Sequence, residues 1–441
     1  MDNNFIFSFS YENLNEHFKD SPQGDYLFCY LKNLNAKTCI VEKEYVDKDY
    51  LIDYQKFYCR SFEKHERFSK RVHFFNKDIS EDSFQKSLEG DYGDLRESYL
   101  GFIVIKPIKD IYENPLIGRT LLKTYPLEEG EKKRFFVKEK YHASLFGVPL
   151  NIMSLPFQAQ DQGVSACATI ALWSSLQPLV YRYGIPSNSP VEITEVATLL
   201  PSPYRRFPSE SGLTWGQMIK YIQSTGLDLE VIRATAETIP TAVKAYINTN
   251  LSLIALLVLK KPDAELVGHA AVISGYQIDE KGNLKELYVH DDQIGPYNRV
   301  KPVNGNFEFW DNEWIRNYGY SYVKLNTFLV PVYEKIRLTF SRIYRFLEKR
   351  KEELYNYLEK KKSEIKSSEF GLELYLYTIR KYKKYLLTCP IEEKIEILTM
   401  PLPRFVWVIR LFFKNQPLRD YIYDATSVYV RRLEIVKYQW V

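Results

Sequence analysis

The sequence predicts an α+β fold, and three observations support this class. Short apolar stretches typical of buried strands alternate with stretches whose apolar residues recur every three or four positions, as in amphipathic helices. Near the middle of the chain, two strand-like stretches flank a turn at residues 279–283, which indicates a β-hairpin and a largely antiparallel sheet. The 441 residues, 45% of them hydrophobic, are enough for two or three domains with cores of their own.

Changes of composition divide the chain into three expected domains, which are residues 1–135, 136–330 and 331–441. The first is expected to be a mixed α/β domain. Its predicted elements are strands at 26–30, 38–41 and 99–105 and a helix at 47–62. Because this region carries no chemical motif, we interpret it as a scaffold packed on the next domain, with substrate selection or a prodomain-like cover as the alternatives.

The last domain is expected to be helix-rich and basic. Helical spacing over 332–366 and 369–386 predicts a helical hairpin, and the runs 405–413 and 428–436 are strand-like. From residue 331 onward the chain has 23 Lys and Arg against 14 Asp and Glu, so the basic excess lies here. Such charge is more often a solvated helix face than a nucleic-acid surface, so we expect a protein partner, if any, and no nucleic acid.

Nothing in the sequence indicates export or a membrane. The amino terminus lacks a basic start followed by an apolar run, and the longest apolar runs are far shorter than the roughly 20 residues of a membrane span. The five cysteines form no C-x-x-C pair, which argues against a disulfide framework and a cysteine zinc site. We therefore expect a cytoplasmic protein without a metal or another cofactor.

The central domain is expected to pack a helix that begins at Cys167 on an antiparallel sheet. A thiol in the first turn of a helix feels the positive end of the helix dipole, which favours the thiolate. The glutamine-rich loop before it could supply an amide donor to an oxyanion. The predicted helices are 167–183, 214–224 and 241–246, and the predicted strands are 228–233, 251–259, 269–276 and 284–290.

A histidine and two carboxylates complete the pattern. His269 begins one strand of the predicted hairpin, and Asp291 and Asp292 follow the end of the other. Because the start of one antiparallel strand lies beside the end of the next, one of these carboxylates is expected to lie near His269. A thiol, an imidazole and an orienting carboxylate are the groups of a nucleophilic triad.

The order Cys167, His269, Asp291 and the run from Gly268 to Tyr276 resemble the papain-like cysteine peptidases. The likeness is strongest to the bacterial branch that removes bacteriocin leaders, whose Val-x-Asp-x-x-x-Gly pattern is matched by residues 289–295. The resemblance covers residues 155–330. It implies a papain-like fold, a Cys167 nucleophile, a His269 base, an orienting Asp291 and an oxyanion hole that includes a glutamine amide.

The chain departs from the family pattern at three places. Ala166-Cys167-Ala168 replaces the Cys-Gly-x-Cys-Trp signature, and Asp161 stands where the oxyanion glutamine is usual. Gln162 and Gln160 flank that position, and we favour Gln162 because a glycine follows it. Asp292 replaces a usual proline and therefore competes with Asp291 for the third role.

The predicted function is hydrolysis of peptide or isopeptide bonds in a protein or peptide substrate through a thioester. Three alternatives stay open. Transglutaminases and arylamine acetyltransferases use the same triad with an amine in place of water. The protein could also be a non-catalytic binding module that works through its basic helices. Finally, His290, Asp291 and Asp292 could form a metal cluster, although the spacing seen in helical zinc hydrolases is absent.

Overall fold

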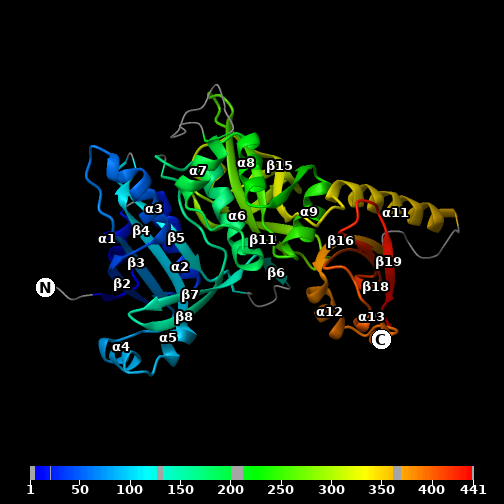
Figure 1. Cartoon of the computed structure of the whole chain (residues 1–441), viewed down its shortest axis with the longest axis horizontal. Coiled ribbons are helices and arrows are strands. Elements are labelled where there is room, and N and C mark those ends of the chain that lie inside the picture. Colours follow the sequence, from blue (N-terminus) through cyan, green and yellow to red (C-terminus); the bar gives the residue numbers. More distant parts are fainter. Residues whose placement is uncertain are drawn as a thin grey trace.

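Antiparallel sheets form the framework of the protein, and helices cover their faces. The structure is a computed structural model that describes residues 5–19, 21–110, 112–126, 133–161, 163–199, 212–360 and 369–439. It has the α+β class, with an amino-terminal sheet, a central barrel and a carboxyl-terminal sheet arranged in a row (Figure 1). Within these ranges, no helix combines the length and hydrophobicity needed to span a membrane.

The amino-terminal sheet has five strands in sequence order. They are β1 (Ile6–Ser8), β2 (Thr38–Tyr45), β3 (Ser69–Phe75), β4 (Tyr99–Lys109) and β5 (Pro115–Leu122). One apolar cluster joins one face of the sheet to α1 (Tyr11–Phe18) and α2 (Pro22–Asn33). A second cluster joins the other face to α4 (Glu81–Leu88), α5 (Gly93–Ser98) and the hairpin β7–β8 (Glu139–Leu145, Val148–Ser154).

The predicted strands at 38–41 and 99–105 are confirmed, but the strand predicted at 26–30 is wrong because these residues lie in α2. Ser21 caps that helix and Pro22 occupies its first turn, which together start a helix before the aromatic run begins. The helix predicted at 47–62 is shorter. It runs as α3 (Lys48–Lys56) from an Asp47 cap and is followed by a 3₁₀ turn at Tyr58–Arg60.

The centre of the molecule is a closed barrel of six antiparallel strands. The strands are β10 (Leu253–Lys260), β11 (Val267–Ile278), β12 (Leu284–Asp291), β13 (Gly295–Val303), β14 (Asn306–Asp311) and β15 (Tyr322–Tyr333). Pairing of β10 with β15 closes the ring, while β9 (Leu227–Arg233) extends it from β15 and β6 (Lys133–Phe136) pairs with β11. The hairpin and the four strands predicted here are confirmed.

Helix α6 (Cys167–Tyr183) packs against β10 and β11, and its predicted limits are confirmed. Buried Ala168 and Ala171 allow this close approach, and Gly184 ends the helix in the left-handed conformation. The other helices are α7 (Pro190–Thr198), α8 (Trp215–Ser224), α9 (Thr238–Ile247) and the short α10 (Glu313–Arg316). Those predicted near 214–224 and 241–246 are α8, capped by Thr214, and α9.

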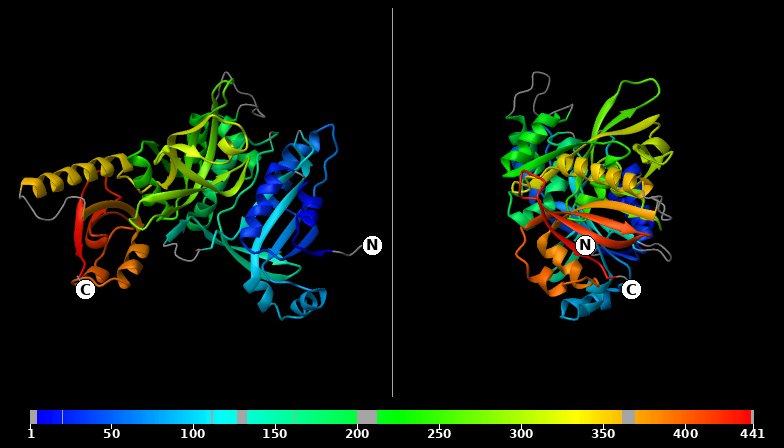
Figure 2. Two further views of the ribbon diagram at one scale, coloured as in Figure 1. Left: turned by 180° about the vertical axis from the view of Figure 1, so that it is seen from behind. Right: turned by 90° about the vertical axis from the view of Figure 1, so that its right-hand side faces the viewer.

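The carboxyl-terminal region is built on a four-stranded sheet. The first predicted helix (332–366) is confirmed over Phe340–Lys360, but the second (369–386) is wrong over Phe370–Thr378, which form a strand, so no helical hairpin is present among the described residues. The strands are β16 (Phe370–Thr378), β17 (Phe405–Phe413), β18 (Gln416–Asp424) and β19 (Arg432–Lys437). Helix α11 (Phe340–Lys360) extends away from the rest of the molecule (Figures 1 and 2), and α12 (Ile379–Leu387) and α13 (Lys394–Thr399) pack on the sheet. The residues of β16 had been assigned to a helix, yet they pair with β17 along all nine positions.

Candidate active site

Cys167 is the first residue of α6. Ala166 before it is extended (φ −115°, ψ 175°), so the chain turns into the helix at the thiol itself. The first N–H groups of a helix have no partner within it, and the Cys167 N–H is one of them. The residue is half-buried, which leaves the thiol within reach of a reactant.

His269 and Asp291 meet across the hairpin. His269 lies near the start of β11, and Asp291 is the last residue of β12. Their side chains are buried, and the distance from His269 Nε2 to Asp291 Oδ2 is 3.1 Å. Because Nε2 faces the carboxylate, Nδ1 is the ring nitrogen that remains for the thiol.

The environment of His269 favours its charged form. Burial lowers the pKa of His269, but the charge and hydrogen bond of Asp291, followed by the hydrogen bond and charge of Cys167, raise it well above its ordinary value. The thiol and the imidazole are thus close enough to interact directly. The structure therefore brings Cys167, His269 and Asp291 together from α6, β11 and β12.

Asp291 is held by three donors. Besides His269, the indole Nε1–H of Trp314 donates to Oδ2 at 2.7 Å, and the backbone N–H of Gln293 donates to Oδ1 at 3.1 Å. Burial raises the pKa of Asp291, but the charge and hydrogen bond of His269 and these two donors lower it below its ordinary value. Trp314 also packs edge-on against the imidazole, with ring centroids 5.3 Å apart.

No sequence pattern assigns Trp314 a role in the site. A tryptophan in α10 gives no signal of its own, because its partner Asp291 lies 23 residues earlier in the chain.

Replacing Trp314 with Phe is expected to lower kcat about 10-fold and to leave KM nearly unchanged. The ring would still pack on His269, but Asp291 would lose one hydrogen bond and hold the imidazole less firmly. Steady-state kinetics on a cleaved peptide measures both constants. Trp310→Phe is the matched control, because its indole donates to the Phe307 carbonyl instead. Equal effects of the two substitutions would contradict a positioning role for Trp314.

Asp292 lies beside the same imidazole but is not bonded to it. Its Oδ1 is 3.8 Å from His269 Nε2, and neither carboxyl oxygen has a hydrogen-bond partner among the residues that the structure describes. Burial, with the neighbouring charge of Asp291, raises the pKa of Asp292 to about 7, although the charge of His269 opposes this. Of the two carboxyls, Asp291 is the one whose geometry suits orientation of His269.

His290 does not join these carboxylates. Its Nδ1 lies 3.4 Å from Ser174 Oγ, its ring packs edge-on against Tyr297, and burial lowers its pKa to about 3. The alternative cluster of His290, Asp291 and Asp292 is therefore not assembled. Instead, His269, Asp291 and Asp292 have potential ligand atoms within 4.8 Å of one another. Both oxygens of Asp291 already accept hydrogen bonds, which leaves less capacity for an ion.

The loop before Cys167 is shaped by Asp161. Its Oδ1 accepts from the backbone N–H groups of Val164 and Ser165, both at 2.9 Å, and from the Ser165 hydroxyl at 3.0 Å. Asp161 thus stabilises a turn as an acceptor, whereas a glutamine amide at this position would carry N–H groups that an oxyanion could use.

The glutamines around Asp161 are placed differently. Gln162 lies outside the described residues, and Gln160 is half-buried without a contact that assigns it a role. Gln158 is buried, and its Nε2 donates to no group in the described part of the chain. Gln158 had not been singled out as a site residue, and its free amide donor now makes it a third glutamine to consider.

The amino-terminal region contacts the turn that follows Asp291. Gln23 Nε2 in α2 donates to the Asp292 carbonyl at 3.2 Å, and the Tyr26 hydroxyl donates to the Pro296 carbonyl at 2.7 Å. Gly295 (φ +155°) lies against the Tyr26 ring so closely that a Cβ there would be 2.3 Å from it. Only glycine fits this contact.

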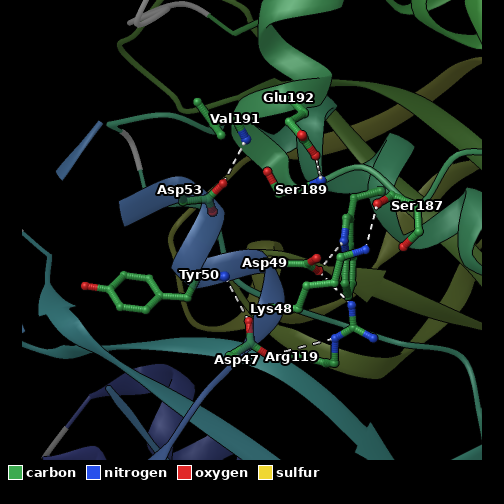
Figure 3. A network of polar contacts seen from close by, with 11 residues as sticks. Asp47, Lys48, Asp49, Tyr50, Asp53, Arg119, Ser187, Ser189, Val191 and Glu192 are labelled. Atoms are coloured by element: carbon green, nitrogen blue, oxygen red, sulfur yellow. Dashed lines mark hydrogen bonds and ion pairs between the residues drawn. The ribbon is translucent and has the colours of Figure 1, made fainter. Parts of the chain in front are cut away.

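The amino-terminal region also contacts α6, the helix that begins at Cys167, and the neighbouring helix α7 (Figure 3). Asp49 accepts from the Trp173 indole of α6 at 2.9 Å and from Arg119 at 2.7 Å, and Asp53 accepts from the Val191 N–H of α7 at 3.0 Å. The amino-terminal region therefore supports both the helix that carries Cys167 and the turn that follows Asp291. These contacts are those expected if residues 1–135 act as a scaffold.

Gly295→Ala is expected to destabilise the protein by about 2 kcal/mol or more and to reduce activity, because the new methyl group meets the Tyr26 ring in a strained backbone conformation. Thermal unfolding and steady-state kinetics test this. The control is Gly305→Ala, at φ +75°, where a Cβ would meet nothing within 4 Å. An effect no larger than that of the control would contradict the close contact with α2.

Comparison with known proteins adds no assignment. No protein-family model matches the chain, and no curated protein matches its sequence.

Proposed function

We propose that the protein is a papain-like cysteine peptidase that hydrolyses peptide or isopeptide bonds of a protein substrate. The observation that carries the proposal is the buried His269–Asp291 pair, with the half-buried Cys167 thiol near enough to help raise the pKa of the imidazole. A helix that starts at the nucleophile and packs on an antiparallel barrel supports the papain-like assignment of residues 155–330. None of the groups involved requires a cofactor.

The reaction follows from the protonation states. In the resting site His269 already holds the proton of the Cys167 thiol, and the thiolate attacks the substrate carbonyl carbon to form a tetrahedral intermediate. The imidazolium returns a proton to the leaving amine, and a thioester remains on Cys167. His269 then takes a proton from water, and the resulting hydroxide attacks the thioester and releases the acid and the thiolate. Asp291 stays ionised throughout and orients the ring.

The oxyanion would be stabilised by donors around the start of α6. The backbone N–H of Cys167 is one, because it has no partner within the helix. A glutamine amide from the preceding loop would be the other. Gln162 and Gln160 are the residues proposed from the sequence, and Gln158 adds a buried amide with a free N–H.

Acyl transfer to an amine is the second candidate, because the same triad serves it. Adding a labelled primary amine to the reaction separates the two. A hydrolase would leave the label in solution, whereas a transferase would attach it to the acyl product. A non-catalytic binding module would neither cut nor transfer, and it would show no reaction that depends on Cys167.

Since no disulfide joins the five cysteines, we infer that the protein acts in a reducing compartment such as the cytoplasm.

The experiment that tests hydrolysis compares new amino termini in cells that express the intact chain and the Cys167→Ala variant. We expect a small set of cleavage sites that appear only with the intact chain. Identical sets of termini from the two strains, with both proteins present at equal amounts, would contradict the proposal.

A further inference from the structure

The loop that leads to Cys167 (residues 158–166) is embedded in an apolar cluster that the amino-terminal region largely supplies. Val164, three residues before the thiol, is buried in this cluster. The other buried members are Tyr50, Tyr58, Ile108, Leu116 and Val191. Four of these five belong to residues 1–135, so the position of the loop depends on packing against that region.

Tyr58 lies directly against the backbone of this loop. A Cβ on Gly163 would be 3.0 Å from Tyr58 Oη and 3.3 Å from Phe57 Cε1. Gly163 does not have a positive φ, so the absence of a side chain there serves the close approach and not a special backbone conformation. The phenol is therefore packed on the loop four residues before Cys167.

Tyr58 and Asp161 each bring a buried polar atom to this contact. Asp161 uses Oδ1 to accept from the N–H groups of Val164 and Ser165, but its Oδ2 has no hydrogen-bond partner of regular geometry in the described part of the chain. The same holds for the Tyr58 hydroxyl. Burial raises the pKa of Tyr58, and the charge of nearby Asp161 raises it further. A buried donor and a buried acceptor that are neighbours gain from pairing, because an unsatisfied polar atom is costly.

We propose that Tyr58 is a positioning residue for the loop before Cys167: its ring packs on Gly163 and its hydroxyl donates to Asp161 Oδ2. The inference rests on the proposed peptidase function. The loop carries the three glutamines considered as oxyanion donors, which are Gln158, Gln160 and Gln162. Tyr58 would thus fix the distance between a glutamine amide and the oxyanion without touching the substrate.

Tyr58→Phe tests the proposal, because it keeps the ring and removes only the hydroxyl. It is expected to lower kcat about 10-fold and to change KM less than about 2-fold, since the oxyanion charge develops only in the transition state. Alkylation of Cys167 by iodoacetamide at pH 6 should proceed at the rate of the intact chain. That reaction depends on the thiol and His269 and needs no oxyanion hole.

Tyr50→Phe is the matched control. Tyr50 lies in the same cluster, but its hydroxyl donates to the Glu66 carbonyl at 2.7 Å and not to the loop. This substitution should lower Tm at least as much as Tyr58→Phe and leave kcat unchanged. A purely structural role of Tyr58 would give the two variants the same kcat.

A double-mutant cycle shows whether Tyr58 acts through Asp161. Asp161→Asn removes the charge and keeps an oxygen for the N–H groups of Val164 and Ser165. The variant with Tyr58→Phe and Asp161→Asn together should lose no more kcat than the more impaired single variant.

Three results would overturn the inference and leave the peptidase proposal standing. They are losses of kcat that multiply in the double variant, a kcat of Tyr58→Phe equal to that of Tyr50→Phe, and a fall of Cys167 alkylation in parallel with kcat. Cleavage that persists in the Cys167→Ala protein would overturn the peptidase proposal and the inference with it.

Discussion

Replacing Cys167 with Ala is expected to lower kcat/KM for peptide cleavage by about 10⁴-fold or more. The thiolate forms the covalent bond to the acyl group, so the substitution removes the nucleophile itself. His269→Ala should have an effect of similar size, because the thiol would lose the group that accepts its proton. Since the two residues act as a unit, the double variant should be little worse than either single variant.

The control for this prediction is Cys59→Ala, which removes an exposed free thiol from the 3₁₀ turn of the amino-terminal domain. It should leave kcat/KM unchanged. Circular dichroism and thermal unfolding would establish that the Cys167→Ala and His269→Ala proteins are folded. Full activity in either of these two folded variants would refute the assignment.

The second large effect is expected at Asp291. Asp291→Ala should lower kcat by about 10²–10⁴-fold, because His269 would lose the carboxylate that fixes the ring and stabilises its charge. The neighbouring substitution Asp292→Asn is the matched control and should cost less than about 10-fold, since Asp292 is not hydrogen-bonded to the ring. A larger loss in Asp292→Asn than in Asp291→Ala would reverse the two assignments.

Asp292 is instead expected to change how the free energy of unfolding depends on pH. Its pKa is about 7 in the folded protein against 3.8 when solvated, so the folded state holds a proton that the unfolded state releases. The contribution of this group to the free energy of unfolding therefore falls as pH rises from about 4 to about 7. Relative to the intact chain, Asp292→Asn should gain thermal stability at pH 8 compared with pH 5. A difference in Tm that is the same at both pH values would contradict this environment.

The site could be predicted from the sequence where its chemistry follows local rules. Gly184 and the apolar spacing after Cys167 define α6 at both ends, and a hairpin with a short turn fixes which strand ends meet. That a carboxylate at the end of β12 lies near His269 follows from that register, whereas the choice of Asp291 over Asp292 does not. These are short-range consequences of residue order.

The missed features depend on contacts between distant residues. Trp314 reaches Asp291 across 23 residues, and Gln23 reaches the Asp292 carbonyl across 269. No local pattern encodes such pairs. The errors of secondary structure have the same origin: β16 is a strand because it pairs with β17, and the aromatic run 26–30 is helical because Ser21 and Pro22 start α2 before it.

The most direct test of the central claim is the rate of Cys167 alkylation by iodoacetamide between pH 6 and pH 9, measured peptide by peptide. An ordinary thiol is only about 0.3% thiolate at pH 6. Because His269 stays protonated beside the sulfur, Cys167 should react at pH 6 at least about 10-fold faster than exposed Cys29 and Cys59, and His269→Ala should abolish this advantage. A Cys167 rate that follows the same pH curve as Cys29 and Cys59, with or without His269, would contradict the thiolate–imidazolium pair on which the account rests.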